Sequence, residues 1–492
     1  MKSSYFILFT IILIFLPVTI DATILHLAVP TLTRELSFTT NQMLWVIDIY
    51  SIVMASFILS MGALGDRIGY KKQLAIGSII FGLGSLGAGL STSAEMLIVA
   101  RAFLGLGAAM ILPGTLAAIR QTFENVKQRN IALGVWGATS AGGAAFGPLL
   151  GGYILEHYEW GMIFLINIPL VLLVLVLIFF FMPKQAVRRS QTVHIAQSII
   201  LVMGILGLIY ALKAAFNGLN FSVVAIFLAG AVLLGYFIRT QQKAANPMVD
   251  LRLFRHPVVI SSMLLTLFAI FAIVGFELLL SQELQFVNRF SPLETGFFIL
   301  PLMLTVSISG PLIGFLSNRF PLQFLTTFGL LLCSLSFFFF AQIHFVEQQV
   351  QACLLMMMLG FGIELALLTS TAALMSTVPS SKATAAGAIG GMAYELGTGL
   401  GIALFGLLLS FFYQQVIVLP PEISSDLSLS AASRSIGEAF SVAQNLPGTT
   451  AAALQQAASS AFVQAHSKVL WMCAGLYFML ALFISYMLRK RK

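Results

Sequence analysis

Five carboxylic acids interrupt apolar stretches of this chain that are otherwise long enough to cross a membrane: Asp21, Asp48, Glu277, Glu364 and Glu395. A charged side chain at the centre of a bilayer costs roughly 2.5–3.5 kcal/mol or more, so such residues are rare and usually functional. A carboxylate in that setting can bind a proton, a cation, or each in turn. These acids therefore indicate proton or cation binding inside a membrane, with no catalytic residue and no metal site.

The first two acids lie at similar depth on consecutive predicted helices. Asp48 is one helical turn from both Trp45 and Ser51, so an acid and an aromatic ring share one face. Asp21 and Asp48 together could bind a cation or share a proton. The alternative for Asp48 is that it reaches water, because it lies only a few residues inside its apolar run. We expect His26, near the outer interface, to be a wetted polar side chain.

Arg101 is the one clear base within these stretches. A buried guanidinium needs an acidic partner, so Arg101 either biases the proton affinity of a nearby carboxylate or serves only as a structural partner. We expect Asp21, Asp48 and Arg101 to couple protons to transport. The predicted substrate-binding residues are Asp21, Trp45, Asp48, Glu277, Glu364 and Glu395.

The three acids of the second half differ in predicted depth. Glu277 lies near the outer end of its run, where it could instead reach water, whereas Glu364 and Glu395 lie nearer the middle. Five acids against one base favour a cationic ligand. Some of the 42 Phe and 20 Met residues are expected to line a soft pocket that suits varied apolar cations.

Fourteen apolar runs supply the helices that must position these residues, because about 20 apolar residues of helix cross a hydrocarbon core. The chain is 59% hydrophobic and only 9% charged, whereas a soluble domain carries about 25% charged residues. We therefore expect an all-α integral membrane protein with 14 transmembrane helices. The runs cover residues 5–27, 43–63, 73–92, 96–119, 131–155, 161–182, 195–214, 221–239, 258–280, 293–316, 322–342, 349–374, 384–413 and 467–488.

The formal net charge of +8 follows membrane topology rather than nucleic-acid binding. Most Lys and Arg residues fall in loops on one side, including Lys71 and Lys72 in a short turn and the basic residues at 489–492. Positively charged loops stay in the cytoplasm, so both termini are expected there, in a plasma membrane that the chain crosses many times. The basic rim could attract anionic lipid headgroups, and no nucleic-acid partner is expected.

The runs divide the chain into two six-helix bundles and a central pair of extra helices. The expected boundaries are 1–182 for the first bundle, 183–257 for the extra helices with their basic loops, and 258–492 for the second bundle. Residues 414–466 are the only long external segment. Within it, Ser433–Ala465 could form one or two amphipathic helices, broken at Pro447, that cover the external mouth; the alternative is a disordered spacer.

Two features could be mistaken for something else: the three cysteines for a metal or disulfide site, and the first apolar run for a signal peptide. Cys333, Cys353 and Cys473 lie inside apolar runs without metal-ligand spacing, so we expect free cysteines. The first run follows Lys2 closely, as in a signal peptide, but it contains Asp21 and lacks a small-residue cleavage site. We therefore expect a retained first helix.

The turn at residues 62–72 reads G-A-L-G-D-R-I-G-Y-K-K and resembles the signature loop between the second and third helices of the major facilitator superfamily. The resemblance implies a conformational latch formed by Gly62, Asp66, Arg67 and Gly69. The alternative is an ordinary positive-inside turn. Residues 314–319 read G-F-L-S-N-R and echo this motif in the second half, with Asn318 in place of the acid.

Further stretches resemble motifs of this superfamily and of its fourteen-helix drug:proton antiporters. Ile20–Pro30, I-D-A-T-I-L-H-L-A-V-P, resembles their first-helix motif, and V-A-R-A-F-L-G-L-G-A-A around Arg101 resembles a fourth-helix motif. The fifth run contains G-x-x-x-G-P-x-x-G-G, which resembles the antiporter motif. Residues 160–169 match a sixth-helix stretch, with Gly161 where that family often carries Arg. The glycine ridge of the fifth run is expected to be a rocking surface; its residues are Gly143, Gly147, Pro148 and Gly151.

The resemblance implies the major facilitator fold and a bacterial plasma-membrane exporter that exchanges protons for lipophilic cations, such as quaternary ammonium compounds, biguanides including chlorhexidine, and cationic dyes. It implies a monomer that is not an enzyme and needs no cofactor beyond the proton-motive force. The chain contains no phosphate-binding G-x-x-x-x-G-K-[ST] motif, which agrees with an ion gradient as the energy source. Two alternatives stay open: a dedicated exporter of one metabolite, polyamine or siderophore, and a non-transporting membrane sensor or scaffold.

Overall fold

The computed structural model describes residues 2–36, 38–123, 125–183, 195–215, 220–244, 247, 251, 256–317, 319–377, 383–420 and 431–489. Within these residues the secondary structure is helical and contains no strand. Three features that the sequence singled out lie outside them: most of the basic loop that follows Pro183, Asn318 of the second-half echo, and the basic residues at 490–492. The side chain of Asp66 also lies outside the described part.

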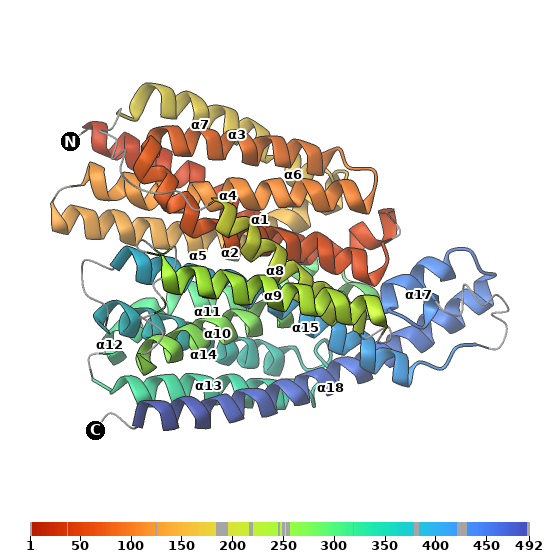
Figure 1. Ribbon diagram of the computed structural model, residues 1–492. Helices are drawn as coiled ribbons and strands as arrows, with labels where there is room; N and C mark the ends of the chain where they lie inside the picture. The colour runs from red at the N-terminus through yellow and green to blue at the C-terminus, as the bar shows by residue number, and fades with distance from the viewer. Residues whose placement is uncertain are drawn as a thin grey trace.

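The first bundle consists of long helices that pack in pairs, α3 on α4, α2 on α4 and α1 on α5. Its helices are α1 (Lys2–Leu36), α2 (Thr40–Ile68), α3 (Tyr70–Gly89), α4 (Ala94–Thr122), α5 (Val126–His157), α6 (Met162–Leu165) and α7 (Asn167–Phe181). Because α6 and α7 follow one another closely, they cross as one element (Figure 1).

The two extra helices form a hairpin on the flank of the bundles. They are α8 (Ile195–Ala215) and α9 (Phe221–Lys243), and they pack mainly against each other. Gly204 and Gly207 of α8 lie against Gly230 of α9, where a side chain would separate the two backbones. Of the two, α8 makes the more extensive contacts with the bundles, at α2 and α15.

The second bundle carries a helical extension. Its helices are α10 (Pro257–Gln282), the π-helical turn η2 (Glu283–Val287), α11 (Pro292–Ile308), α12 (Gly310–Ser317), α13 (Leu322–Phe340), α14 (Gln349–Thr377), α15 (Ala383–Val416), α17 (Ile436–Ala443) and α18 (Gly448–Arg489). The most extensive packing joins α10 to α15, α13 to α18 and α13 to α14. The bundles lie side by side in Figure 1.

The predicted apolar runs coincide with helices. Eleven helical segments of the described residues are long and apolar enough to cross a membrane. The other runs lie on α3, which begins beside Lys71 and Lys72, on the glycine-rich α5, and on α11, which has only 17 residues. An all-helical membrane protein is therefore confirmed, while the count of 14 crossings stays a prediction.

The segment expected as a long external loop is largely helical. α15 continues to Val416, and α18 is one helix of 42 residues from Gly448, so residues 448–466 extend the last membrane helix. The Ala-rich sequence explains this continuity, because Ala has the highest helix propensity. The predicted break at Pro447 is present, and α17 precedes it. Figure 1 shows α17 and the start of α18 projecting at the end opposite the start of α1.

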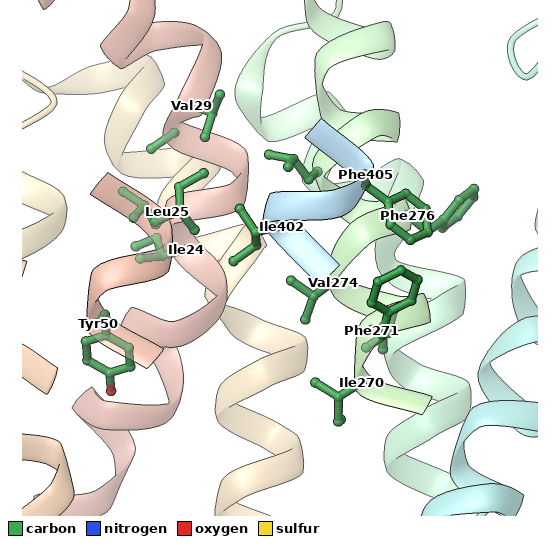
Figure 2. Close-up of a cluster of buried hydrophobic side chains, with 14 of the residues drawn as sticks. Ile24, Leu25, Val29, Tyr50, Ile270, Phe271, Val274, Phe276, Ile402 and Phe405 are labelled. Atoms are coloured by element: carbon green, nitrogen blue, oxygen red, sulfur yellow. The ribbon is translucent and has the colours of Figure 1, made fainter. Parts of the chain in front are cut away.

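The bundles meet through apolar contacts beside the projecting helices. Figure 2 shows Ile24, Leu25 and Val29 of α1 on one side and α10 on the other, with Ile402 of α15 between them. These residues belong to one buried cluster that spans both bundles. At this end, which we call the α17 end, the amide of Gln285 donates to the Leu27 carbonyl at 3.0 Å. The interface between the bundles is therefore closed at the α17 end.

Candidate functional site

Arg101 and Asp21 form an ion pair in the interior of the first bundle. Each residue is 1% exposed, and Nη1 of Arg101 donates to Oδ2 of Asp21. Nε of Arg101 donates to the Val46 carbonyl at 3.2 Å, and the guanidinium lies 4.5 Å from the centre of the Tyr50 ring. Arg101 therefore joins α4 to both α1 and α2, and each buried charge depends on the other.

Tyr50 and Ser51 connect this ion pair to the second bundle. The Tyr50 hydroxyl lies 3.5 Å from the Val18 carbonyl, and the ring is close enough to Asp21 and Glu395 for both carboxylates to act on that hydroxyl. Ser51, the next residue, donates a hydrogen bond to the Glu395 carboxyl. Consecutive residues of α2 thus face charged groups of different bundles.

Asp48 and Trp45 of α2 have different surroundings. Asp48 is fully buried at 0% exposure, so the alternative that it reaches water is wrong. Trp45 turns toward the extra helices, where its ring lies 6.4 Å from that of Tyr210 on α8. The aromatic ring expected at a cation site therefore lies at the contact between α2 and α8.

The three acids of the second bundle lie within electrostatic range of Tyr394. Glu277 on α10 is 3% exposed, so it does not reach water as the alternative supposed, and Glu364 on α14 is partly buried. The charges of Glu277, Glu364 and Glu395 all act on the Tyr394 hydroxyl. The Tyr394 side chain is 44% exposed even though it lies well inside α15. The structure thus places the three acids within electrostatic range of one aromatic residue of α15.

The glycine ridge of α5 packs against α1, within the first bundle. A side chain at Gly143 would meet Thr19, one at Gly147 would meet Thr23, and one at Gly151 would meet Ile24. These α1 residues flank Asp21 on both sides. The sequence motif did not say which helix the ridge faces, and the structure places it against α1 of the same bundle. A role in rocking stays a prediction.

The contact between bundles instead uses Pro148 and Gly152, on another face of α5. A Cβ atom at Gly296 of α11 would lie 2.9 Å from the Pro148 carbonyl oxygen. A Cβ atom at Gly152 would lie 2.7 Å from Cα of Leu293, also on α11. Backbones this close require glycine. Of the predicted rocking residues, Pro148 is the one that touches the other bundle here.

A family model for the Major Facilitator Superfamily matches residues 11–402 of the chain. The chain belongs to this superfamily. Methyl viologen resistance protein SmvA of Salmonella typhimurium is 48% identical over 482 residues, which cover 98% of this chain and 97% of that protein. Multidrug efflux pump LfrA of Mycolicibacterium smegmatis is 33% identical over 448 residues, 90% of this chain and 88% of that protein. The chain is thus a membrane transporter of the drug-efflux type and not an enzyme.

Solved structures show the same fold at low sequence identity. A bacterial homologue of the human lysosomal transporter Spinster superposes with a TM-score of 0.71 at 16% identity, covering 99% of this chain and 98% of that one. A transporter of the POT family in complex with 5-aminolevulinic acid gives a TM-score of 0.64 at 13% identity, covering 97% and 95%. The major facilitator fold is therefore confirmed.

The signature loop of this superfamily member makes contacts within the first bundle. Gly69 has a φ of 86°, which suits glycine at the turn between α2 and α3. Lys71 donates to the Phe179 carbonyl at 3.0 Å and to the Met182 carbonyl, so it binds the carbonyl end of α7. A side chain at Gly65 would displace Gln73. A Cβ atom at Gly62 would lie 3.9 Å from Cβ of Pro113, and Arg67 is exposed.

Three polar residues of this transporter were not singled out by the sequence. Gln73 is 1% exposed and donates to the Met61 carbonyl at 2.8 Å and to the Met110 carbonyl at 3.0 Å. Glu283 in η2 bonds Nδ1 of His466 on α18, and both side chains are buried. Gln73 could have been found from the sequence, because an amide side chain within an apolar run needs buried hydrogen-bond partners. His466 gave none, because its partner lies 183 residues away.

His26 and the cysteines complete the comparison with the sequence. His26 is 3% exposed, so the expectation of a wetted side chain is wrong: α1 continues beyond it to Leu36. Its backbone carbonyl accepts a hydrogen bond from Ser281 of α10 at 3.0 Å. Cys333, Cys353 and Cys473 are free, as predicted. Among the described residues, no group of three or more His, Cys, Asp or Glu side chains is placed to hold a metal ion.

Proposed function

We propose that this transporter is a proton-coupled antiporter that exports lipophilic cationic drugs and biocides, including quaternary ammonium compounds, biguanides and cationic dyes. The observation that carries the proposal is the buried pair of Asp21 and Arg101, next to Tyr50, which also faces Glu395 of the other bundle. The name of the Salmonella relative supports cationic cargo, because methyl viologen is a dication.

Asp21 is the proposed exchange site for the proton. While Asp21 is ionised, Arg101 neutralises it, and the pair holds α1 against α4. When a proton binds, the ion pair loses one of its charges, and Arg101 keeps its contacts with Val46 and Tyr50. The protonation state of one carboxylate therefore changes how three helices are joined. Such a change can be coupled to alternating access.

The acids around Tyr394 are the proposed binding site for the cation. Glu277, Glu364 and Glu395 supply negative charge, and the Tyr394 ring supplies an aromatic face for a cation. A monocation needs one of these carboxylates, whereas a dication can use two. Asp48 and Trp45 extend the site along α2. Because the charges of Asp21 and Glu395 both act on Tyr50, cation binding at Glu395 can affect proton binding at Asp21.

The closed interface at the α17 end is the proposed external gate. Gln285 and Ser281 bond backbone carbonyls of α1 beyond Asp21, and Gly296 packs on Pro148. Outward opening must break these contacts, and α1 carries both the gate contacts and Asp21. We place the α17 end outside the cell and both termini in the cytoplasm, with the chain as a monomer in a bacterial plasma membrane, driven by the proton-motive force without a cofactor.

Purified protein in lipid vesicles with an imposed pH gradient tests this function. Cation uptake and proton movement are measured together, using methyl viologen, a quaternary ammonium compound and chlorhexidine. Uptake of several unrelated cations that collapses when the pH gradient is abolished supports the proposal. Transport of one metabolite or polyamine alone would favour a dedicated exporter. Absence of any cation-dependent proton movement would overturn the antiport mechanism.

A further inference from the structure

A small apolar pocket lies where α8 covers the contact between α2 and α15. Its volume is about 110 Å³, several times the roughly 30 Å³ that one water molecule occupies in the liquid. α8 contacts both α2 and α15 at this place (Figure 1). The lining residues are Ile52, Ile205, Leu208, Ile209, Glu395, Leu396, Gly399 and Leu400.

Glu395 is the one charged residue among the described side chains that line the pocket. It is 8% exposed, and Ser51 donates a hydrogen bond to its carboxyl. Every other lining residue is aliphatic or glycine. A buried carboxylate in an otherwise apolar wall selects a ligand that combines a positive charge with apolar substituents.

The open volume depends on a glycine and on the extra helices. A Cβ atom at Gly399 would meet Ile52 at an ordinary distance of 3.6 Å, so the absent side chain leaves space rather than relieving a clash. Ile205 and Ile209 of α8 form the opposite wall, in a small cluster with Ile52 and Trp45. Without α8, the pocket would lack the wall opposite Glu395.

We propose that this pocket binds the headgroup of a lipophilic monocation that arrives from the bilayer, with Glu395 as its counter-ion and α8 as its wall. The inference rests on the proposed function and adds a route of entry to it. The volume accommodates an alkylammonium headgroup with its first methylene groups. The remaining chain would lie along the exposed apolar face of α8, where Met203 is 54% and Tyr210 is 43% exposed.

The same geometry predicts a difference between two kinds of cargo. A lipophilic monocation partitions into the membrane and meets α8, whereas a hydrophilic dication such as methyl viologen does not. The dication would reach Glu277 and Glu364 without passing α8. A defect in the α8 wall should therefore affect the first kind of cargo selectively.

The test uses Leu208→Trp, which fills the pocket from α8, and Val232→Trp, which adds the same side chain at a 69% exposed position of α9, outside the pocket lining. In vesicles, the KM for octyltrimethylammonium should rise about tenfold in Leu208→Trp, a loss of about 1.4 kcal/mol. The KM for methyl viologen should stay within about twofold, and Val232→Trp should match the wild type for both. Equal losses for both cations, or no change for either, would overturn the pocket as an entry site.

Equilibrium binding of radiolabelled octyltrimethylammonium to the full chain in nanodiscs separates this inference from the proposed function. Affinity should fall in Leu208→Trp and in Glu395→Gln, and octanol should compete poorly. If binding follows this pattern but vesicles show no proton coupling, the antiport proposal fails and the site stands. If octanol competes as well as the cation, the pocket holds lipid chains and the inference fails.

Discussion

Gly147 of α5 lies directly against Thr23 of α1, two residues from Asp21. The glycine ridge that resembles an antiporter motif thus contacts the helix that carries the proposed proton site. The contact lies within one bundle, so the ridge fixes the position of α1 relative to α4 and Arg101. We therefore propose that the ridge positions the ion pair rather than letting the bundles slide.

Gly147→Leu is expected to abolish transport while the protein still inserts into the membrane. The leucine side chain would push α1 away and separate Asp21 from Arg101. Drug-dependent proton movement in vesicles measures the effect, with the amount of folded protein checked by size-exclusion chromatography. Gly142→Leu is the matched control, because a Cβ atom there meets nothing within 4 Å. If Gly147→Leu pumped like this control, the packing of the ridge would be irrelevant to coupling.

Gly296→Leu is expected to hold the α17 end open, because a Cβ atom there would lie 2.9 Å from the Pro148 carbonyl oxygen. A bias of about 1.4 kcal/mol toward the open state would raise labelling of Ile24→Cys by an impermeant maleimide about tenfold. The background variant replaces the three native cysteines with alanine. Gly314→Leu serves as the control, since its Cβ atom would meet nothing within 4 Å. Unchanged labelling would show that α5 and α11 are not part of the external gate.

The helices were predictable because hydrophobicity alone determines which segments enter a bilayer. The approach of Arg101 to Asp21 was also foreseeable, since a buried guanidinium needs an acid and α1 offers one. The helix that packs on the glycine ridge could not be predicted, because every helix that could pack there is equally apolar. The pair of Glu283 and His466 could not be predicted for a similar reason: nothing near His466 indicates which distant helix it meets.

Asp66→Asn is expected to slow transport of every substrate by a similar factor and to leave the order of preference unchanged. The signature loop joins α2 and α3 and binds the end of α7 through Lys71, away from the acids around Tyr394. Turnover rates for three cations of different size measure the effect. Lys71→Gln alters the same loop. It should mainly lower the free energy of unfolding, by roughly 0.3–1 kcal/mol. A changed order of preference in Asp66→Asn would contradict a latch remote from the substrate.

Asp21→Asn is expected to eliminate drug-triggered proton release for every cationic substrate, since it removes the one carboxylate that Arg101 contacts within the first bundle's described residues. Glu277→Gln or Glu364→Gln should instead lower the affinity for some substrates, especially dications, and leave the affinity for others unchanged. The measurement is proton release from detergent-purified protein on adding drug, together with drug affinity. The structure adds one complication. Asp21→Asn leaves Arg101 buried without an acid, and breaking such a pair costs about 3–5 kcal/mol.

The double variant Asp21→Asn with Arg101→Gln separates that instability from the loss of coupling. It removes both charges, so the folding defect of the single variant should be largely relieved, while proton release stays absent because no carboxylate remains at position 21. Thermal stability should rank wild type and double variant close together and the single variant lowest. Near-normal proton release from the stable double variant would remove the coupling role from Asp21. The role would then pass to Glu395, whose carboxyl accepts a hydrogen bond from Ser51 beside the Tyr50 ring that covers Arg101.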